Sequence, residues 1–179
     1  SSIRQDDLLD MLLDARYDDG TEMDEEQLID EILILFTAGH ETTSNSLTFT
    51  CELLARHPEI QEKLYADVIQ AKENSSNLME FIQRSTYANL VIDESMRLYP
   101  PAYFIDRISL AEDEFEGVGI GGNESLLLSI YEIHRHNDYW QQPEKFIPER
   151  FADGKQRKNI AYYPFGAGPR KCIGNNFAM

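Results

Sequence analysis

The sequence predicts a mainly α-helical protein with a small β-sheet. Apolar residues recur at helical spacing through most of the first 98 residues. Short β-rich runs, separated by acidic and glycine turns, follow between Tyr103 and Ile130. The chain of 179 residues is long enough to bury a core, and its 42% hydrophobic and 27% charged residues are typical of an ordinary folded protein.

Helices are expected in five stretches before the sheet. Residues 6–16 place four leucines at helical spacing. A long helix over 25–56 should begin at a capping box formed by Asp24 and Gln27. Pro58 should end it, because proline disfavours helix in the residue before it. The remaining helices are expected over 58–71, 78–84 and 86–98.

The centre of the long helix combines an apolar run with polar residues. The run ILILF at 32–36 is apolar on every face, which predicts that this part is buried, and Cys51 is expected to be a small buried thiol on the same helix. The segment AGHETTS at 38–44 then places a glycine, a carboxylate and hydroxyls where they lower helix stability. Either the helix is kinked, with hydroxyls bonded to carbonyls one turn earlier, or Gly39 lets a flat ligand approach the backbone.

The runs 103–110, 116–120 and 125–130 are expected to form the small sheet, with Gly121-Gly122-Asn123 as a hairpin turn. Arg107 is a charged residue in an otherwise apolar strand. It either faces water at a sheet edge or binds a carboxylate, to which a guanidinium can bond bidentately.

The chain after the sheet is expected to be mostly coil. One helical turn is predicted over 131–136, where His134 and His136 are too few for a closed metal site, so structural roles are expected for them. No period persists over 138–164, where aromatic residues recur, and this pattern predicts a long coil fixed by aromatic packing.

The stretch FGAGPRKCIG at 165–174 carries the strongest functional signal. Cys172 lies between Gly168 and Gly174, and Arg170 and Lys171 precede it directly. Glycines let the backbone bend closely around a group, and neighbouring cations favour thiolate over thiol, as does the helix expected from residue 175. Such a loop either presents a sulfur ligand or is an exposed turn with an incidental free cysteine.

Charge and cysteine content limit the partners and the compartment. The net charge of −16 opposes binding to nucleic acid or an anionic membrane surface. Two cysteines cannot make a disulfide framework, so a reducing, cytoplasmic compartment is expected, with a membrane anchor elsewhere in the parent protein left open. Residues 155–171 contain no acidic residue, and they form either a solvated basic loop or a docking patch for an acidic electron donor. The basic residues of this stretch are Lys155, Arg157, Lys158, Arg170 and Lys171.

Three motifs resemble signatures of the cytochrome P-450 family of haem-thiolate monooxygenases. They are the Phe-x-x-Gly-x-Arg-x-Cys-x-Gly loop at 165–174, AGHETTS at 38–44 and Glu94-x-x-Arg97. The resemblance implies a partial cytochrome P-450 fold, the haem-binding core truncated at both ends, as one fragment over 1–179. The cofactor it implies is haem b (iron protoporphyrin IX), with the Cys172 thiolate as axial iron ligand.

The resemblance also assigns roles to residues outside the cysteine. Thr42 and Glu41 would be catalytic, delivering protons to bound dioxygen. Glu94, Arg97 and the arginine of Pro148-Glu149-Arg150-Phe151 would form a buried scaffold, whereas the spacing of Glu94 and Arg97 alone also allows a weak surface pair. Arg107, with Arg170 as a second candidate, would bind a haem propionate. Other haem contacts are implied for Phe165, Gly166, Gly174, Ala38 and Gly39.

The activity implied is hydroxylation of a small lipophilic organic substrate with dioxygen and two electrons. The electron donor would be an acidic ferredoxin, a flavodoxin or a flavoprotein reductase, and no nucleic acid partner is expected. Two alternatives stay open: a haem-thiolate peroxygenase or isomerase, and a non-catalytic fragment unable to hold haem. The identity of the substrate is not readable from these residues.

Overall fold

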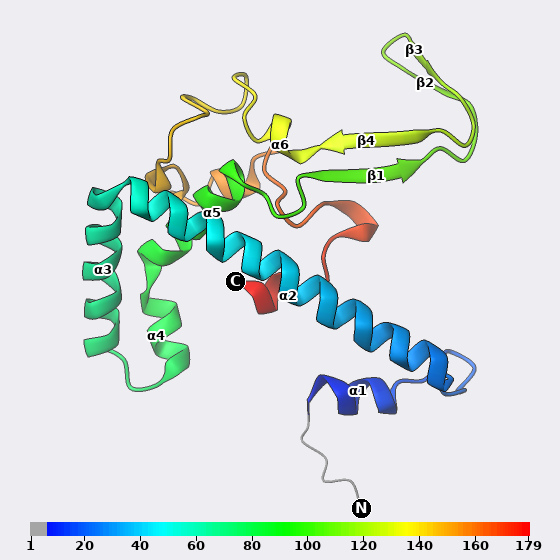
Figure 1. Cartoon of the computed structure of the whole chain (residues 1–179), viewed down its shortest axis with the longest axis horizontal. Helices are drawn as coiled ribbons and strands as arrows, with labels where there is room; N and C mark the ends of the chain where they lie inside the picture. Colours follow the sequence, from blue (N-terminus) through cyan, green and yellow to red (C-terminus); the bar gives the residue numbers. More distant parts are fainter. Residues whose placement is uncertain (1–6) are drawn as a thin grey trace, which may run out of the picture. The chain divides into compact units, whose positions relative to one another are not determined.

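A computed structural model of the chain describes residues 7–179 (Figure 1). The described chain is mainly helical with small two-stranded sheets, which confirms the predicted class. It divides into two compact units, Ser1–Thr42 and Thr43–Met179, and the long helix crosses the boundary. Among the helices of residues 7–179, none is both long enough and apolar enough to cross a membrane.

The first unit holds α1 (Leu8–Asp14) and most of α2 (Glu25–Arg56). The Asp7 carboxylate caps α1 by accepting a hydrogen bond from the Asp10 amide at 3.1 Å. The predicted start of this helix at residue 6 lies outside the described residues. The carboxylate of Asp24 accepts from the Gln27 amide at 2.8 Å, so the capping signal at the start of α2 is present in the structure.

The apolar run of α2 is not buried, and the prediction that it is covered on every face is wrong for the described residues. Phe36 is 70% exposed and Ile34 is 60% exposed. Cys51, expected to be buried, is also exposed. An apolar helix is buried only where other segments pack on all of its sides, and residues 7–179 leave these side chains uncovered.

The second unit is built around α5 (Thr86–Leu98), whose side chains are mostly buried from Val91 onward. It packs against α3 (Pro58–Glu73), which starts with proline at its first turn, and α3 contacts the short α4 (Leu78–Arg84). One core cluster lies among these helices and the end of α2. It contains Leu53, Ile60, Tyr87, Val91, Leu98 and Phe146.

Four strands form two separate antiparallel pairs. β1 (Phe104–Ile108) pairs with β4 (Ser125–Ser129), and Phe104 lies opposite Ser129. β2 (Asp113–Phe115) pairs with β3 (Val118–Ile120) in a hairpin that Figure 1 shows beyond the far end of β1 and β4.

The hairpin turn is not at Gly121-Gly122-Asn123, so that prediction is wrong. The chain reverses at Glu116 and Gly117, which have φ angles of 49° and 82°. Positive φ at both central residues is what a two-residue hairpin turn of the favoured hand requires. The glycine segment instead leads from β3 back to β4, and the Asn123 amide donates to the Ser109 carbonyl at 2.9 Å.

Little regular structure follows β4. The described elements there are short. They are the α-helices α6 (Ile130–Ile133) and α7 (Asn175–Ala178) and the 3₁₀ helices η1 (Pro148–Phe151), η2 (Gln156–Lys158) and η3 (Gly168–Arg170). A second core cluster contains Trp140, Phe151 and Ala161, with Tyr162 packed against it. The ring centroids of Phe151 and Tyr162 are 4.8 Å apart. The aromatic packing expected for this coil is therefore present.

The aromatic cluster should supply a large part of the stability of the second unit. Replacing Phe151, which is 1% exposed, with alanine leaves a cavity between Trp140 and Tyr162. The Phe151→Ala variant should lose about 3–5 kcal/mol of unfolding free energy, measured by urea denaturation. Leu110→Ala removes a fully exposed side chain and should change stability by less than about 0.5 kcal/mol. Equal losses in both variants would contradict the packing described.

Candidate functional site

The cysteine loop, residues 165–174, is closed by its own backbone. The Cys172 amide donates to the Phe165 carbonyl at 2.9 Å, and the Lys171 amide donates to Gly168 at 3.1 Å. Gly166 and Gly168 have φ angles of 72° and 70°, in the left-handed region that favours glycine. The glycines of the motif are thus needed for the path of the chain as well as for close approach of a ligand.

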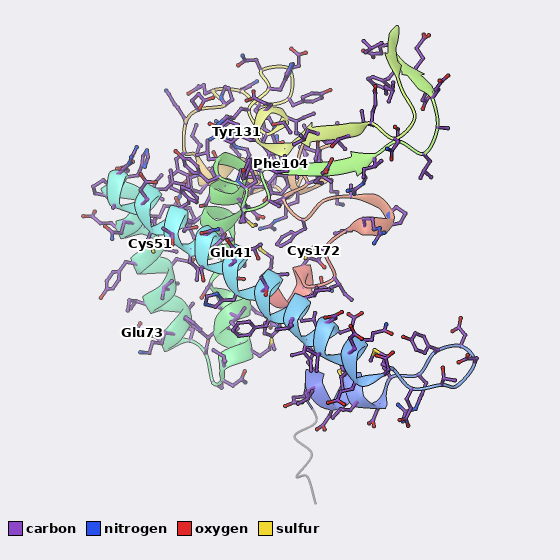
Figure 2. All side chains as sticks on the ribbon, turned by 45° about the vertical axis from the view of Figure 1, so that its right-hand side comes forward. Glu41, Cys51, Glu73, Phe104, Tyr131 and Cys172 are labelled. Carbon is purple, nitrogen blue, oxygen red and sulfur yellow. The ribbon has the colours of Figure 1, made fainter. Side chains whose placement is uncertain are left out.

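The Cys172 side chain is exposed, at the place labelled in Figure 2. A Cβ added to Gly174 would lie 3.9 Å from the Cys172 Sγ, so glycine keeps that side of the sulfur clear. Arg170 and Lys171 are exposed beside it. An accessible sulfur with cations nearby and no bulky neighbour at Gly174 is suited to act as a ligand.

The start of the loop contacts β1 and the residue that follows α6, His134. The Tyr163 amide donates to the His134 Nε2 at 3.1 Å, and the Gly166 amide donates to the Tyr163 carbonyl at 2.9 Å. A Cβ on Gly166 would lie 3.6 Å from the Ile105 Cδ1, so the loop lies against the first strand.

The structure brings the predicted scaffold residues together around one carboxylate. Arg97 Nε donates to Glu94 Oε2 at 2.7 Å, and Arg97 Nη2 donates to Oε1 at 2.9 Å. Arg150 Nε donates to the same Oε1 at 3.1 Å, although it is 53 residues further along the chain than Arg97. The side chains of Glu94 and Arg97 are fully buried, and that of Arg150 is 11% exposed. The pair is therefore not a surface ion pair.

This cluster has one more positive than negative charge, and backbone groups stabilise the excess. Arg97 also donates to the carbonyls of His134 at 2.8 Å and Lys145 at 3.2 Å. Arg150 Nη2 donates to the Gln142 carbonyl at 2.7 Å. The Trp140 ring lies 5.1 Å from the Arg97 guanidinium carbon, a cation–π contact. The cluster therefore fixes the coil on both sides of Trp140.

A second buried acid, Asp93, ties the basic stretch to α5, and sequence analysis did not identify it. Arg157 Nε donates to Asp93 Oδ2 at 2.6 Å, and the Tyr162 hydroxyl donates to Oδ1 at 2.9 Å. Burial raises the pKa of Asp93, while Arg157 and Tyr162 oppose that rise. The one sequence signal was a second acid next to Glu94 on the same helix. Arg157 thus has a buried partner although its own side chain is 43% exposed, and Lys155 pairs with the exposed Asp153 at 3.3 Å. Lys158, Arg170 and Lys171 are also exposed.

His134 is completely buried and remains neutral at physiological pH. Its ring stacks on Tyr162 with centroids 5.4 Å apart. Burial, helped by the charges of Arg97 and Arg135, lowers its pKa to about 4 against the opposing effect of the backbone groups of Arg97 and Met96. His136, by contrast, is exposed near Asp138. Among residues 7–179, no three His, Cys, Asp or Glu side chains gather as a metal-binding group.

The predicted catalytic residues lie on α2. The Thr42 hydroxyl donates to the Ala38 carbonyl at 2.6 Å, one turn earlier. This is the bond expected if the hydroxyls of the segment serve the helix itself, and α2 is continuous through it. Ala38, Gly39 and Glu41 are exposed, and a Cβ on Gly39 would meet no atom within 4 Å. Figure 2 labels Glu41 on this helix.

Arg107 is exposed on β1, an edge strand of a two-stranded sheet, and its Nη1 donates to the neighbouring Asp106 carbonyl at 2.7 Å. This is the position expected of an edge charge facing water. It leaves most of the guanidinium donors available to a ligand.

The Glu94 cluster yields a mutational prediction. Glu94→Gln keeps the shape of the side chain but leaves two buried guanidiniums without a counter-ion. The variant should lose about 3–5 kcal/mol of unfolding free energy in urea titrations. Glu80→Gln is the control, because Glu80 belongs to a solvent-screened i,i+4 pair with Arg84 and its loss should change the unfolding free energy far less. A loss from Glu94→Gln as small as that of the control would show that the cluster is not structural.

Burial of His134 also predicts a pH dependence of stability. Its pKa is about 4 in the folded chain and 6.5 for the ordinary group, so the unfolded chain takes up the proton first as pH falls. Stability present above pH 6.5 should be lost progressively down to about pH 4, by about 3 kcal/mol in total. The check is the unfolding free energy across this range for the wild type and for His134→Gln, which should be flatter. Parallel curves would refute the assignment.

Comparisons with known proteins identify the family of the chain. The family model for cytochrome P450 matches residues 1–179. Cyclooctat-9-en-7-ol 5-monooxygenase of Streptomyces melanosporofaciens is 35% identical over 97% of this chain and 38% of its own length. Cytochrome P450 3A6 of Oryctolagus cuniculus is 32% identical over 98% of this chain and 36% of its own length.

A solved structure gives the same result. Retinoic acid bound cyanobacterial CYP120A1 superposes with a TM-score of 0.90 and 32% identity, over 99% of this chain and 42% of that one. The chain therefore spans less than half the length of these relatives. With the family match running over its whole length, the chain belongs to the cytochrome P450 family.

Proposed function

We propose that this chain forms the haem-binding part of a monooxygenase, with Cys172 as the thiolate ligand of the iron. The observation that carries the proposal is the closed loop, which turns at the left-handed Gly166 and Gly168 and exposes the Cys172 sulfur beside Arg170 and Lys171. The residues present fit a haem-thiolate site because the sulfur is accessible and Gly174 leaves it uncrowded. When bound, haem would activate dioxygen and transfer one oxygen atom to an organic substrate.

The residues around the cysteine would orient the cofactor. Phe165, Gly166 and Gly174 would contact it beside the cysteine. Roles in binding it are also proposed for Ala38 and Gly39 of α2, where a Cβ on Gly39 would meet no atom within 4 Å. Arg107 and Arg170 are exposed guanidiniums suited to the cofactor's carboxylates. The macrocycle is proposed to be haem b.

Thr42 and Glu41 would handle protons. The Thr42 hydroxyl donates its hydrogen to Ala38, so its oxygen lone pairs stay available to accept a hydrogen bond from a bound group. Glu41 is an exposed carboxylate one residue earlier and would exchange protons with solvent. Proton delivery is needed when dioxygen and electrons are used, so this pair favours a monooxygenase over a peroxide-using or isomerising relative.

The partners proposed are a small lipophilic substrate and an acidic electron-transfer protein. The exposed cations Lys158, Arg170 and Lys171 lie in the cysteine loop or before it, in a chain whose net charge is −16. They would attract an acidic ferredoxin, flavodoxin or flavoprotein reductase by charge complementarity. Arg157 contributes less to such a patch, because Asp93 neutralises it.

The carbon monoxide difference spectrum of the reduced, haem-loaded intact protein tests this function. The wild type should show the red-shifted Soret band of a thiolate ligand. Cys172→Ala should abolish that band, whereas Cys51→Ala, which removes the chain's other exposed cysteine, should keep it. A thiolate band that persists in Cys172→Ala would overturn the ligand assignment. Failure of the wild type to take up haem would favour a non-catalytic fragment.

A further inference from the structure

His134 contacts both the Glu94 cluster and the start of the cysteine loop. Its backbone carbonyl accepts a hydrogen bond from Arg97 Nη1 at 2.8 Å. Its ring Nε2 accepts a hydrogen bond from the Tyr163 amide at 3.1 Å. One fully buried residue therefore connects the scaffold to the backbone two residues before the loop begins.

Backbone hydrogen bonds continue from Tyr163 to the sulfur. The Tyr163 carbonyl accepts from the Gly166 amide at 2.9 Å, and the Phe165 carbonyl accepts from the Cys172 amide at 2.9 Å. The loop itself contains only a single 3₁₀ turn, at 168–170. The placement of Cys172 therefore depends on where the Tyr163 backbone is held.

The hydrogen bond to Tyr163 fixes the tautomer of His134. A backbone amide can only donate, so Nε2 must be unprotonated and the proton of the neutral ring must be on Nδ1. Nδ1 is buried without a partner at hydrogen-bond geometry, and the backbone groups that act on the ring are those of Arg97 and Met96.

The surroundings of the ring preserve this state. The charged groups that face it are Arg97 and Arg135, and both oppose a second proton. The Tyr162 and Tyr163 rings lie with centroids 5.4 Å and 5.7 Å from it, and they restrict its orientation. Protonation of Nε2 would convert the acceptor to a donor facing another donor.

We propose that His134 is a positioning residue for the thiolate ligand: as a neutral acceptor it holds the Tyr163 backbone and so sets where Cys172 stands relative to the Glu94 scaffold. This inference rests on the proposed function for its effect on the iron, but the hydrogen-bond relay belongs to the protein alone. Loss of the acceptor should loosen the loop before it unfolds the core.

Two variants separate the acceptor from the ring. His134→Phe keeps an aromatic ring of similar size but leaves the Tyr163 amide unpaired. His134→Gln places an amide oxygen at a similar reach and can restore the bond. Ile60→Ala is a control that weakens the core cluster among the helices, away from the loop.

Amide hydrogen exchange of residues 163–174 in the intact protein is the first measurement. His134→Phe should exchange at least about tenfold faster there than the wild type, because a buried hydrogen bond is lost. His134→Gln should stay within about threefold of the wild type, and Ile60→Ala should not accelerate this segment selectively. Equal exchange in the phenylalanine variant and the wild type would overturn the proposal.

The haem-loaded protein provides a second readout. His134→Phe should convert part of the carbon monoxide complex from the thiolate-type band to the band of a weakened or lost thiolate, and His134→Gln should restore it. If Cys172→Ala removes the thiolate band and His134→Phe leaves it intact, the effect on the ligand is refuted while the proposed function stands. If Cys172→Ala keeps that band, the proposed function fails, and hydrogen exchange alone decides the relay.

Nitrogen NMR of the wild-type histidine rings decides the case if the phenylalanine variant does not fold. The proposal requires a proton on Nδ1 and a bare Nε2 for His134 at pH 7. A ring protonated on Nε2, or on both nitrogens, would refute it.

Discussion

One buried carboxylate, shared by two arginines, joins α5 to the coil that follows the strands of the second unit. Removing Glu94, Arg97 and Arg150 from water costs more than a surface ion pair gains, so the arrangement is stable only because its polar atoms have partners. The Ile147 amide donates to Glu94 at 2.9 Å, and carbonyls of the coil accept from the arginines. These coil segments contain little helix or strand. Hydrogen bonds to the charged cluster therefore fix them, as backbone hydrogen bonds fix the residues of helices and sheets.

The cysteine loop depends on this cluster through two kinds of contact. One is the aromatic packing of Trp140, Phe151 and Tyr162, which buries the coil next to the cluster. The other is directional: hydrogen bonds through His134 determine where the chain enters the loop. Non-directional burial stabilises the coil, but it does not specify the position of one sulfur atom. Buried polar groups with defined hydrogen-bond geometry can specify that position, but each must keep the protonation state that its partner requires.

Some charged side chains of this chain form buried ion pairs, and others remain exposed, where they can attract a partner. The net charge of −16 is spread over an excess of exposed acids, yet several of its 16 Lys and Arg residues are committed to the interior or to a buried partner. Counting cations between residues 155 and 171 therefore overstates the basic patch, because Arg157 is neutralised by Asp93 from a distant part of the sequence. The exposed cations nearest the sulfur are the ones left to interact with a partner.

The sequence by itself determined the elements whose signals are local. Capping residues and Pro58 gave the bounds of α2, glycines marked the loop around Cys172, and the spacing of Glu94 and Arg97 placed them on one helical face. Without the resemblance, however, that spacing could not separate a surface pair from a buried one. Only the tertiary structure decided the strand pairing, because the Glu116-Gly117 turn has a weaker sequence signature than the nearby glycine pair. It also decided the exposure of Cys51, because burial depends on what packs against a helix. The sequence predicted a structural role for His134 but not its partner, and it did not identify Asp93, since folding brings the partners of both from elsewhere in the chain.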